Sequence, residues 1–238
     1  MKTGNVKQVA AFGKLVGICN DLGAGYNPSK EALQLNAITS LFTQAQQSLE
    51  AMRVARTNYI LAVNERQEIF AGVYTRSSRV VRALVSTESS MENIRDAKLL
   101  KRKLNPSLPG KMVSAPSAGQ EGSNAIISRT SSRLDFDGVA DTFARLVKLV
   151  ESIPAYAPNE ADLKVSALKS MHADLISQSQ AVANAVHALA MARISRNSMI
   201  TGKDGLIQTA NAVKDYIRSV YGVRSEQAKE LGKLRLVA

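Results

Sequence analysis

The sequence has no tryptophan, one cysteine (Cys19) and two histidines, and aromatic residues make up only 5% of its 238 residues. A single cysteine excludes an internal disulfide, so we expect a reducing location, the cytoplasm, although a lone cysteine is also compatible with an exported protein. On one continuous helix, His172 and His187 would lie about 22 Å apart, too far to share a metal ion. We therefore expect neither a metal site nor a cofactor.

Catalytic motifs are also missing from the sequence. It contains no Gly-x-x-x-x-Gly-Lys-Ser/Thr phosphate loop, and its carboxylates lack the spacing of an acid/base pair. Cys19 falls on the apolar side of a predicted first helix, where a buried core thiol is more expected than a nucleophile. We therefore expect that the protein is not an enzyme.

Two stretches of 18 residues, 32–49 and 175–192, carry no charged side chain. Both are rich in Gln, Ser, Asn or Thr, which a bilayer interior disfavours, so we predict no membrane span. Such stretches instead indicate helices that are covered by neighbouring helices or by another subunit.

An internal repeat is the strongest pattern in the sequence. The motif Tyr-x-Pro occurs at Tyr26 and Pro28 and again at Tyr156 and Pro158, 130 residues later. At the same spacing, Arg66 matches Arg196 and Gly72 matches Gly202, and the apolar positions between them correspond. This correspondence predicts a tandem duplication, with residues 9–104 and 140–236 as the two copies.

Each copy should fold as one short helix, one long helix and two further short helices. The prolines prevent helix immediately before them, and Ser29 and Asn159 are predicted N-caps of helices about 40 residues long. A break near Asn64 is the alternative to an uninterrupted long helix. The predicted fold class is all-α, an elongated helical bundle of two tandem, pseudo-symmetric units, each with one long central helix and three shorter ones.

We predict two helical domains, an N-terminal half (residues 1–104) and a C-terminal half (135–238). Between them, residues 105–134 contain three prolines, three glycines and seven serines. This composition is typical of a flexible linker.

The net charge of +11 is concentrated in the N-terminal half, which has 15 Lys and Arg against 8 Asp and Glu. The C-terminal half has 13 against 11. Clustered cations in the basic half define a candidate polyanion-binding surface. Its members are Arg76, Arg79, Arg82, Lys98, Lys101, Arg102 and Lys103. The alternative is a solvated face of a helix.

Arg66 and Arg196 occupy equivalent positions among apolar neighbours. We expect each to pack its aliphatic stem and to pair with a carboxylate on a facing helix. Contact with a ligand is the alternative.

Three segments, 156–165 (YAPNEADLKV), 192–197 (ARISRN) and 217–222 (IRSVYG), together resemble a family of uncharacterised all-helical tandem-repeat proteins of Bacteroidota bacteria. No activity is established for that family. The resemblance implies a bacterial origin and supplies no functional residues.

The sequence favours a structural or scaffold protein that acts through helix-mediated self-assembly or partner binding. The expected partners are other copies of the chain or another protein. The alternative is sequence-independent binding to the backbone of DNA or RNA through the basic surface of the N-terminal half. Contact with a membrane surface is weaker, since no helix combines a cationic face with bulky aromatics.

Overall fold

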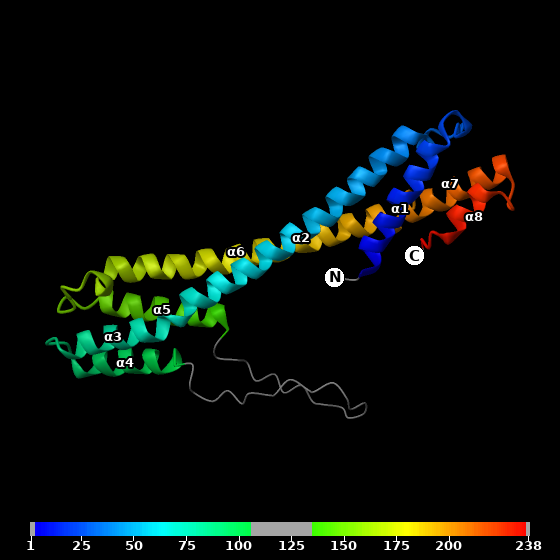
Figure 1. Cartoon of the computed structure of the whole chain (residues 1–238). Helices are drawn as coiled ribbons and strands as arrows, with labels where there is room; N and C mark the ends of the chain where they lie inside the picture. Colours follow the sequence, from blue (N-terminus) through cyan, green and yellow to red (C-terminus); the bar gives the residue numbers. More distant parts are fainter. Residues whose placement is uncertain (1–2, 106–134, 237–238) are drawn as a thin grey trace, which may run out of the picture. The chain divides into compact units, whose positions relative to one another are not determined.

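The computed structural model describes residues 3–105 and 135–236, and every regular element in these ranges is helical. The all-α class is therefore confirmed for the described residues. The predicted linker lies outside them, apart from Asn105. The α-helices are α1 (Thr3–Asp21), α2 (Leu35–Ala71), α3 (Val73–Val85), α4 (Met91–Lys103), α5 (Phe136–Glu151), α6 (Val165–Thr201), α7 (Leu206–Tyr221) and α8 (Glu226–Lys233) (Figure 1). Short 3-10 turns are η1 (Gly23–Gly25), η2 (Glu31–Leu33) and η3 (Ala161–Leu163).

The long helices α2 and α6 have 37 residues each, and α2 passes Asn64 without interruption. They begin later than predicted, so Ser29 and Asn159 are not their N-caps. The 3-10 turns η2 and η3 come first, and each is followed by an extended residue, Gln34 (ψ 151°) or Lys164 (ψ 145°). The extended residue stops the turn from continuing into the helix.

The compact units of the chain cross the predicted domain boundaries. Unit 1 consists of Met1–Ile60 and Asn184–Ala238, and unit 2 of Leu61–Ala183. The division at residues 104 and 135 therefore does not separate compact units. The physical reason is that α2 and α6 are uninterrupted, so each carries the chain from one unit into the other.

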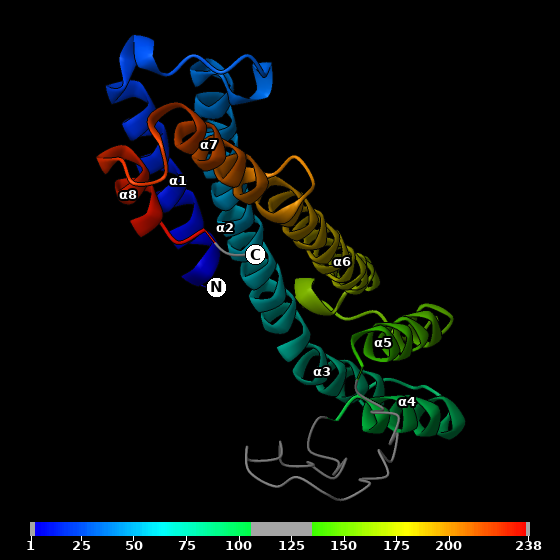
Figure 2. The same cartoon turned by 90° about the vertical axis from the view of Figure 1, so that its right-hand side faces the viewer.

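The core of unit 1 brings together the beginning of α2, the end of α6 and three short helices, α1, α7 and α8. Its fully buried side chains include Phe12, Ile38, Ile200 and Ile217. α1 packs against α7, and α7 packs against α8 (Figure 2). Helices from both halves of the sequence thus share this core.

The core of unit 2 has the complementary set of elements: the end of α2, α3, α4, α5 and the beginning of α6. Phe143 and Leu84 are fully buried there, as are Leu168 and Leu175. α4 packs against both α3 and α5 (Figure 1). Each unit therefore combines the first helix of one half with the last two helices of the other.

α3 of unit 2 and α7 of unit 1 match at a spacing of 133 residues. Four positions on each helix are at most 1% exposed: Val73, Ser77, Val80 and Leu84 on α3, and Leu206, Ala210, Val213 and Ile217 on α7. Ser86 Oγ donates to the carbonyl oxygen of Ala83 at 2.8 Å, and Ser219 Oγ donates to that of Tyr216 at 2.7 Å. Matching positions are thus buried on α3 and α7, and this common register allows the two helices to be compared residue by residue.

Candidate binding surfaces

Two of the predicted phosphate-binding arginines are used inside unit 2. Arg76 Nη1 lies 2.6 Å from a carboxylate oxygen of Asp162 and also donates to the Asp162 backbone oxygen at 2.6 Å. Arg79 forms a second ion pair with the same carboxylate. The hydrogen bond from Arg79, with the charge of Arg76, lowers the pKa of Asp162. Both arginines thus link α3 to η3 through ion pairs with Asp162.

The remaining predicted cations have a different environment. They are Arg82, Lys98, Lys101, Arg102 and Lys103. Within the described residues, none of these five side chains forms an ion pair. Lys98, Arg102 and Lys103 are exposed. Three of them fall in the last turn of α4, where the helix dipole favours positive charge. The predicted surface therefore divides into a pair of structural arginines and a group of free cations.

The distribution of charge also differs between the compact units. The residues of unit 1 include 15 Lys and Arg against 7 Asp and Glu, whereas those of unit 2 include 16 against 13. The net positive charge is thus larger in unit 1, which takes residues from both halves of the sequence. The description of the N-terminal half as the basic unit does not carry over to the folded units.

Among residues 3–105 and 135–236, Arg66 and Arg196 form no ion pair with a carboxylate, contrary to the prediction. The Arg66 guanidinium lies over the ring of Phe136, 3.9 Å from its centroid, and Phe136 meets Phe70 edge to face at 4.8 Å. Arg196 donates to the side-chain oxygen of its neighbour Asn197 at 2.8 Å. Arg66 therefore packs by a cation–π contact, which its sequence neighbours did not indicate because Phe136 comes from α5.

The repeated glycines Gly72 and Gly202 differ in what they require. A β-carbon on Gly202 would come within 2.3 Å of the Ser198 carbonyl oxygen. A β-carbon on Gly72 would lie 3.6 Å from its nearest backbone atom. Of these two positions, therefore, only that of Gly202 lacks room for a β-carbon.

The two Tyr-x-Pro turns form the same hydrogen bond. Tyr26 donates from its hydroxyl group to the Leu33 carbonyl oxygen, and Tyr156 donates to that of Leu163 at 2.9 Å. Burial, with the charges of Glu160 and Asp162, raises the pKa of Tyr156 to about 12. Each tyrosine thus holds the 3-10 turn that precedes a long helix. Pro28 is buried and Pro158 half-buried in these turns.

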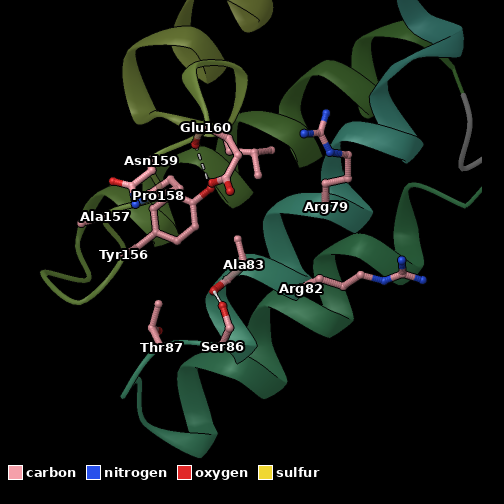
Figure 3. A pocket seen from close by; sticks show the side chains of 11 residues that line it. Arg79, Arg82, Ala83, Ser86, Thr87, Tyr156, Ala157, Pro158, Asn159 and Glu160 are labelled. Atoms are coloured by element: carbon pink, nitrogen blue, oxygen red, sulfur yellow. Dashed lines mark hydrogen bonds between the residues drawn. The ribbon is translucent and has the colours of Figure 1, made fainter.

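A hollow of about 470 Å³ lies within unit 2, between the second half of α3 and the turn at Tyr156 (Figure 3). Ala83 and Tyr156 line it from its two sides. Arg79 and Arg82 contribute to its rim, and their side chains run away from the Tyr156 ring (Figure 3). The hollow therefore has an aromatic wall and a small side chain opposite it.

One face of α6 is exposed although the helix has no charge between residues 175 and 192. Ile176 is 50% exposed and Ile194 is 61% exposed, whereas Val182 on the opposite face is 6% exposed. Between the two isoleucines, exposed residues follow one another at alternating spacings of four and three: Ile176, Gln180, Ala183, His187, Ala190 and Ile194. We call this row the α6 stripe. Neighbouring helices of the same chain thus cover one side of α6, and the side that carries the α6 stripe is exposed.

Other chemistry among the described residues is sparse. They contain no group of three His, Cys, Asp or Glu side chains arranged to hold a metal ion. Cys19 is buried, and burial raises the pKa of its thiol to about 11 despite a hydrogen bond with Tyr26 that lowers it. His172 is half-buried and His187 is exposed, both on α6. The raised pKa keeps the Cys19 thiol protonated at neutral pH.

Within residues 3–105 and 135–236, no helix combines the length and the apolar character needed to cross a bilayer. In comparisons with known proteins, no family model, no curated protein and no solved structure matches the chain.

Proposed function

We propose that this protein is a non-enzymatic, cytoplasmic scaffold that assembles with further copies of itself through the α6 stripe. The observation that carries the proposal is an uncharged, partly apolar row with the heptad spacing of a helix–helix seam, exposed on a folded chain. Exposed apolar rows of this kind mark interaction surfaces. The absence of charge along the row gives an acidic or basic partner nothing to pair with.

The order of residues in the α6 stripe favours an antiparallel pair of α6 helices. Read from either end, the row begins with isoleucine, and in an antiparallel pair Ile176 faces Ile194 of the second copy. In the same arrangement Ala183 faces His187 and Ala190 faces Gln180, so between the two isoleucine pairs a small side chain lies opposite a larger one. Small residues in a seam let two helices approach closely. A second copy is therefore the partner whose residues match the row.

The mass of the protein in solution tests the proposal. We expect light scattering to give a dimer or larger species for the native chain, with the fraction of monomer rising on dilution. Replacing both Ile176 and Ile194 with Asp should give a folded monomer, because both side chains are exposed. Met91→Asp is the matched control, since Met91 is 78% exposed on α4 and lies outside the row. A native chain that stays monomeric at hundreds of micromolar would contradict the proposal.

We further propose that the two halves are copies of one ancestral unit whose long helices exchange partners. The equal lengths of α2 and α6, the paired tyrosine hydrogen bonds and the common register of α3 and α7 support this origin. In this proposal each compact unit is a reassembled copy of the ancestral fold, with the helices of one half completed by those of the other.

Binding to the backbone of DNA or RNA is the second candidate function. It rests on the free cations at the end of α4, since unpaired Lys and Arg drive phosphate binding by releasing counterions. Arg76 and Arg79 contribute less to this candidate, because Asp162 already neutralises part of their charge.

A further inference from the structure

The hollow in unit 2 has a counterpart in unit 1 that is filled by a tyrosine side chain. In the common register of α3 and α7, Ala83 matches Tyr216. The ring of Tyr216 meets the ring of Tyr26 edge to face, with centroids 5.5 Å apart and planes at 86°. Tyr26 is the counterpart of Tyr156. Unit 1 therefore places an aromatic ring of its own against the tyrosine of the Tyr-x-Pro turn.

The hydroxyl group of Tyr216 in unit 1 also accepts a hydrogen bond. The backbone N–H of Asn27 donates to the hydroxyl oxygen of Tyr216 at 3.1 Å. The matching N–H in unit 2 belongs to Ala157 and donates instead to Ala155 within its own turn, at 3.2 Å. A phenol ring in the hollow of unit 2 would find a ring wall at Tyr156, and its hydroxyl oxygen would replace the Ala155 oxygen as the acceptor of the Ala157 N–H.

Two hydrogen bonds made by residues that line the hollow recur in unit 1. Ser86 and Ser219 make the same hydrogen bond one turn further along their helices. Tyr156 and Tyr26 both donate to the carbonyl oxygen seven residues ahead. Ala83 thus stands beside these two bonds where unit 1 has Tyr216, and the hollow of about 470 Å³ lies where Ala83 faces the turn.

We propose that the hollow beside Ala83 and Tyr156 is a binding site for an exposed tyrosine side chain of a partner polypeptide, which takes the place that Tyr216 fills in unit 1. The occupant is a polypeptide because an amino-acid side chain, Tyr216, fills the matching place in unit 1, and the exposed rim residues Arg82 and Glu160 can pair with charged side chains of a partner. This site is separate from the α6 stripe, so it stands whether or not the protein self-assembles.

The probe is the capped tripeptide acetyl-Gly-Tyr-Gly-amide, titrated into the intact 238-residue protein and followed by amide chemical shifts. We expect shifts at Ala83, Thr87 and Ala157, weaker binding of the Phe tripeptide, and none of the Ala tripeptide. Ala83→Tyr should weaken binding at least tenfold, because the new side chain fills the hollow as Tyr216 does. Val85→Tyr adds the same side chain to an exposed position of α3 outside the hollow and should leave binding unchanged.

The reciprocal variant keeps the proposal testable even if Ala83→Tyr does not fold. Tyr216→Ala should open the matching place in unit 1 and produce a second set of shifts at Asn27. No shift in the native protein at millimolar tripeptide would overturn the proposal, as would equal affinity in a folded Ala83→Tyr protein. Binding of free tyrosine without binding of the capped tripeptide would also overturn it, because the occupant would then be a small molecule.

Discussion

The hydroxyl group of Tyr156 donates a hydrogen bond to the carbonyl oxygen of Leu163, seven residues ahead, and Tyr26 does the same to Leu33. The bond closes a loop that begins at the Tyr-x-Pro turn and ends just before the long helix. It explains why the tyrosine and the proline recur together: the proline shapes the turn, and the tyrosine fastens its end.

Removal of the Tyr156 hydroxyl group should destabilise the protein. Tyr156→Phe leaves the buried Leu163 carbonyl oxygen without its partner, which costs about 1–3 kcal/mol in the free energy of unfolding. The pKa of Tyr156 is raised from 10.0 to about 12 in the folded chain, so its contribution is complete below pH 10 and is lost as the pH rises through 12. Urea unfolding at pH 7 and above pH 10 measures both effects. An unchanged unfolding midpoint in Tyr156→Phe would show that the bond contributes nothing.

Asp162 should contribute stability that depends on acid. Its pKa is lowered in the folded chain by Arg79 and Arg76, so the contribution is present above the ordinary carboxyl pKa of 3.8 and is lost as the pH falls through the lowered value. Asp162→Asn should lower the melting temperature at pH 7, and the difference from the native protein should shrink in acid. Ala32 occupies the matching place in unit 1, so Ala32→Asn is the control and should have little effect. A difference that stays constant from pH 7 to acid would contradict the ion-pair explanation.

The two faces of α6 should respond differently to the same substitution. Val182→Asp buries a charge, because the side chain is 6% exposed, and should cost more than about 3 kcal/mol in the free energy of unfolding. Ile176→Asp lies on the exposed face and should change that free energy by less than about 0.5 kcal/mol when the protein is monomeric. Circular dichroism during thermal unfolding, at low concentration, compares the two variants. Equal destabilisation would mean that the α6 stripe is part of the core.

The nucleic-acid alternative predicts a clear order among the cations. Lys98→Glu with Arg102→Glu should weaken binding to random duplex DNA and reduce its dependence on salt, because neither side chain forms an ion pair with another described residue. Arg76→Gln should affect binding less and lower stability more, since its role is to hold Asp162. Fluorescence anisotropy at about 50 mM salt, where such contacts are strong, measures the affinity. Absence of binding there would remove the alternative.

Much of the helical framework could be predicted from local sequence. Ser90 and Ser225 are the N-caps of α4 and α8, and each accepts a hydrogen bond from the backbone N–H three residues ahead. Such caps are local signals, readable without knowledge of packing. The late start of α2 was missed because the 3-10 turn η2 and the extended residue Gln34 come between Ser29 and the helix.

The composition of the compact units could not be predicted from the repeat alone. If the halves are copies of one unit, as proposed, the repeat leaves open whether α1 pairs with α3 of its own half or with α7 of the other, and α1 packs against α7. The partner is decided by whether α2 reverses near Asn64, and a continuous helix of 37 residues does not reverse. Four residues that the sequence singled out for other roles, Arg79, Arg82, Tyr156 and Pro158, line one hollow. The ion pairs to Asp162 were missed because that carboxylate is distant in sequence.

The antiparallel pairing of the α6 stripe with a second copy is tested most directly by spin labels at two positions that flank the row, Ser177 and Ala188. Cys19→Val provides the background, because the matching residue in unit 2 is Val150. With Ile176 facing Ile194, symmetry-related labels at Ser177 should lie about 24 Å apart along the helix axis and those at Ala188 about 9 Å apart, at 1.5 Å per residue. Double electron–electron resonance and dipolar line broadening measure these separations. A long distance at Ser177 with a short one at Ala188 is the predicted result. Equally short distances at both positions would mean parallel helices, and no interaction between labels at either position would contradict self-assembly through α6.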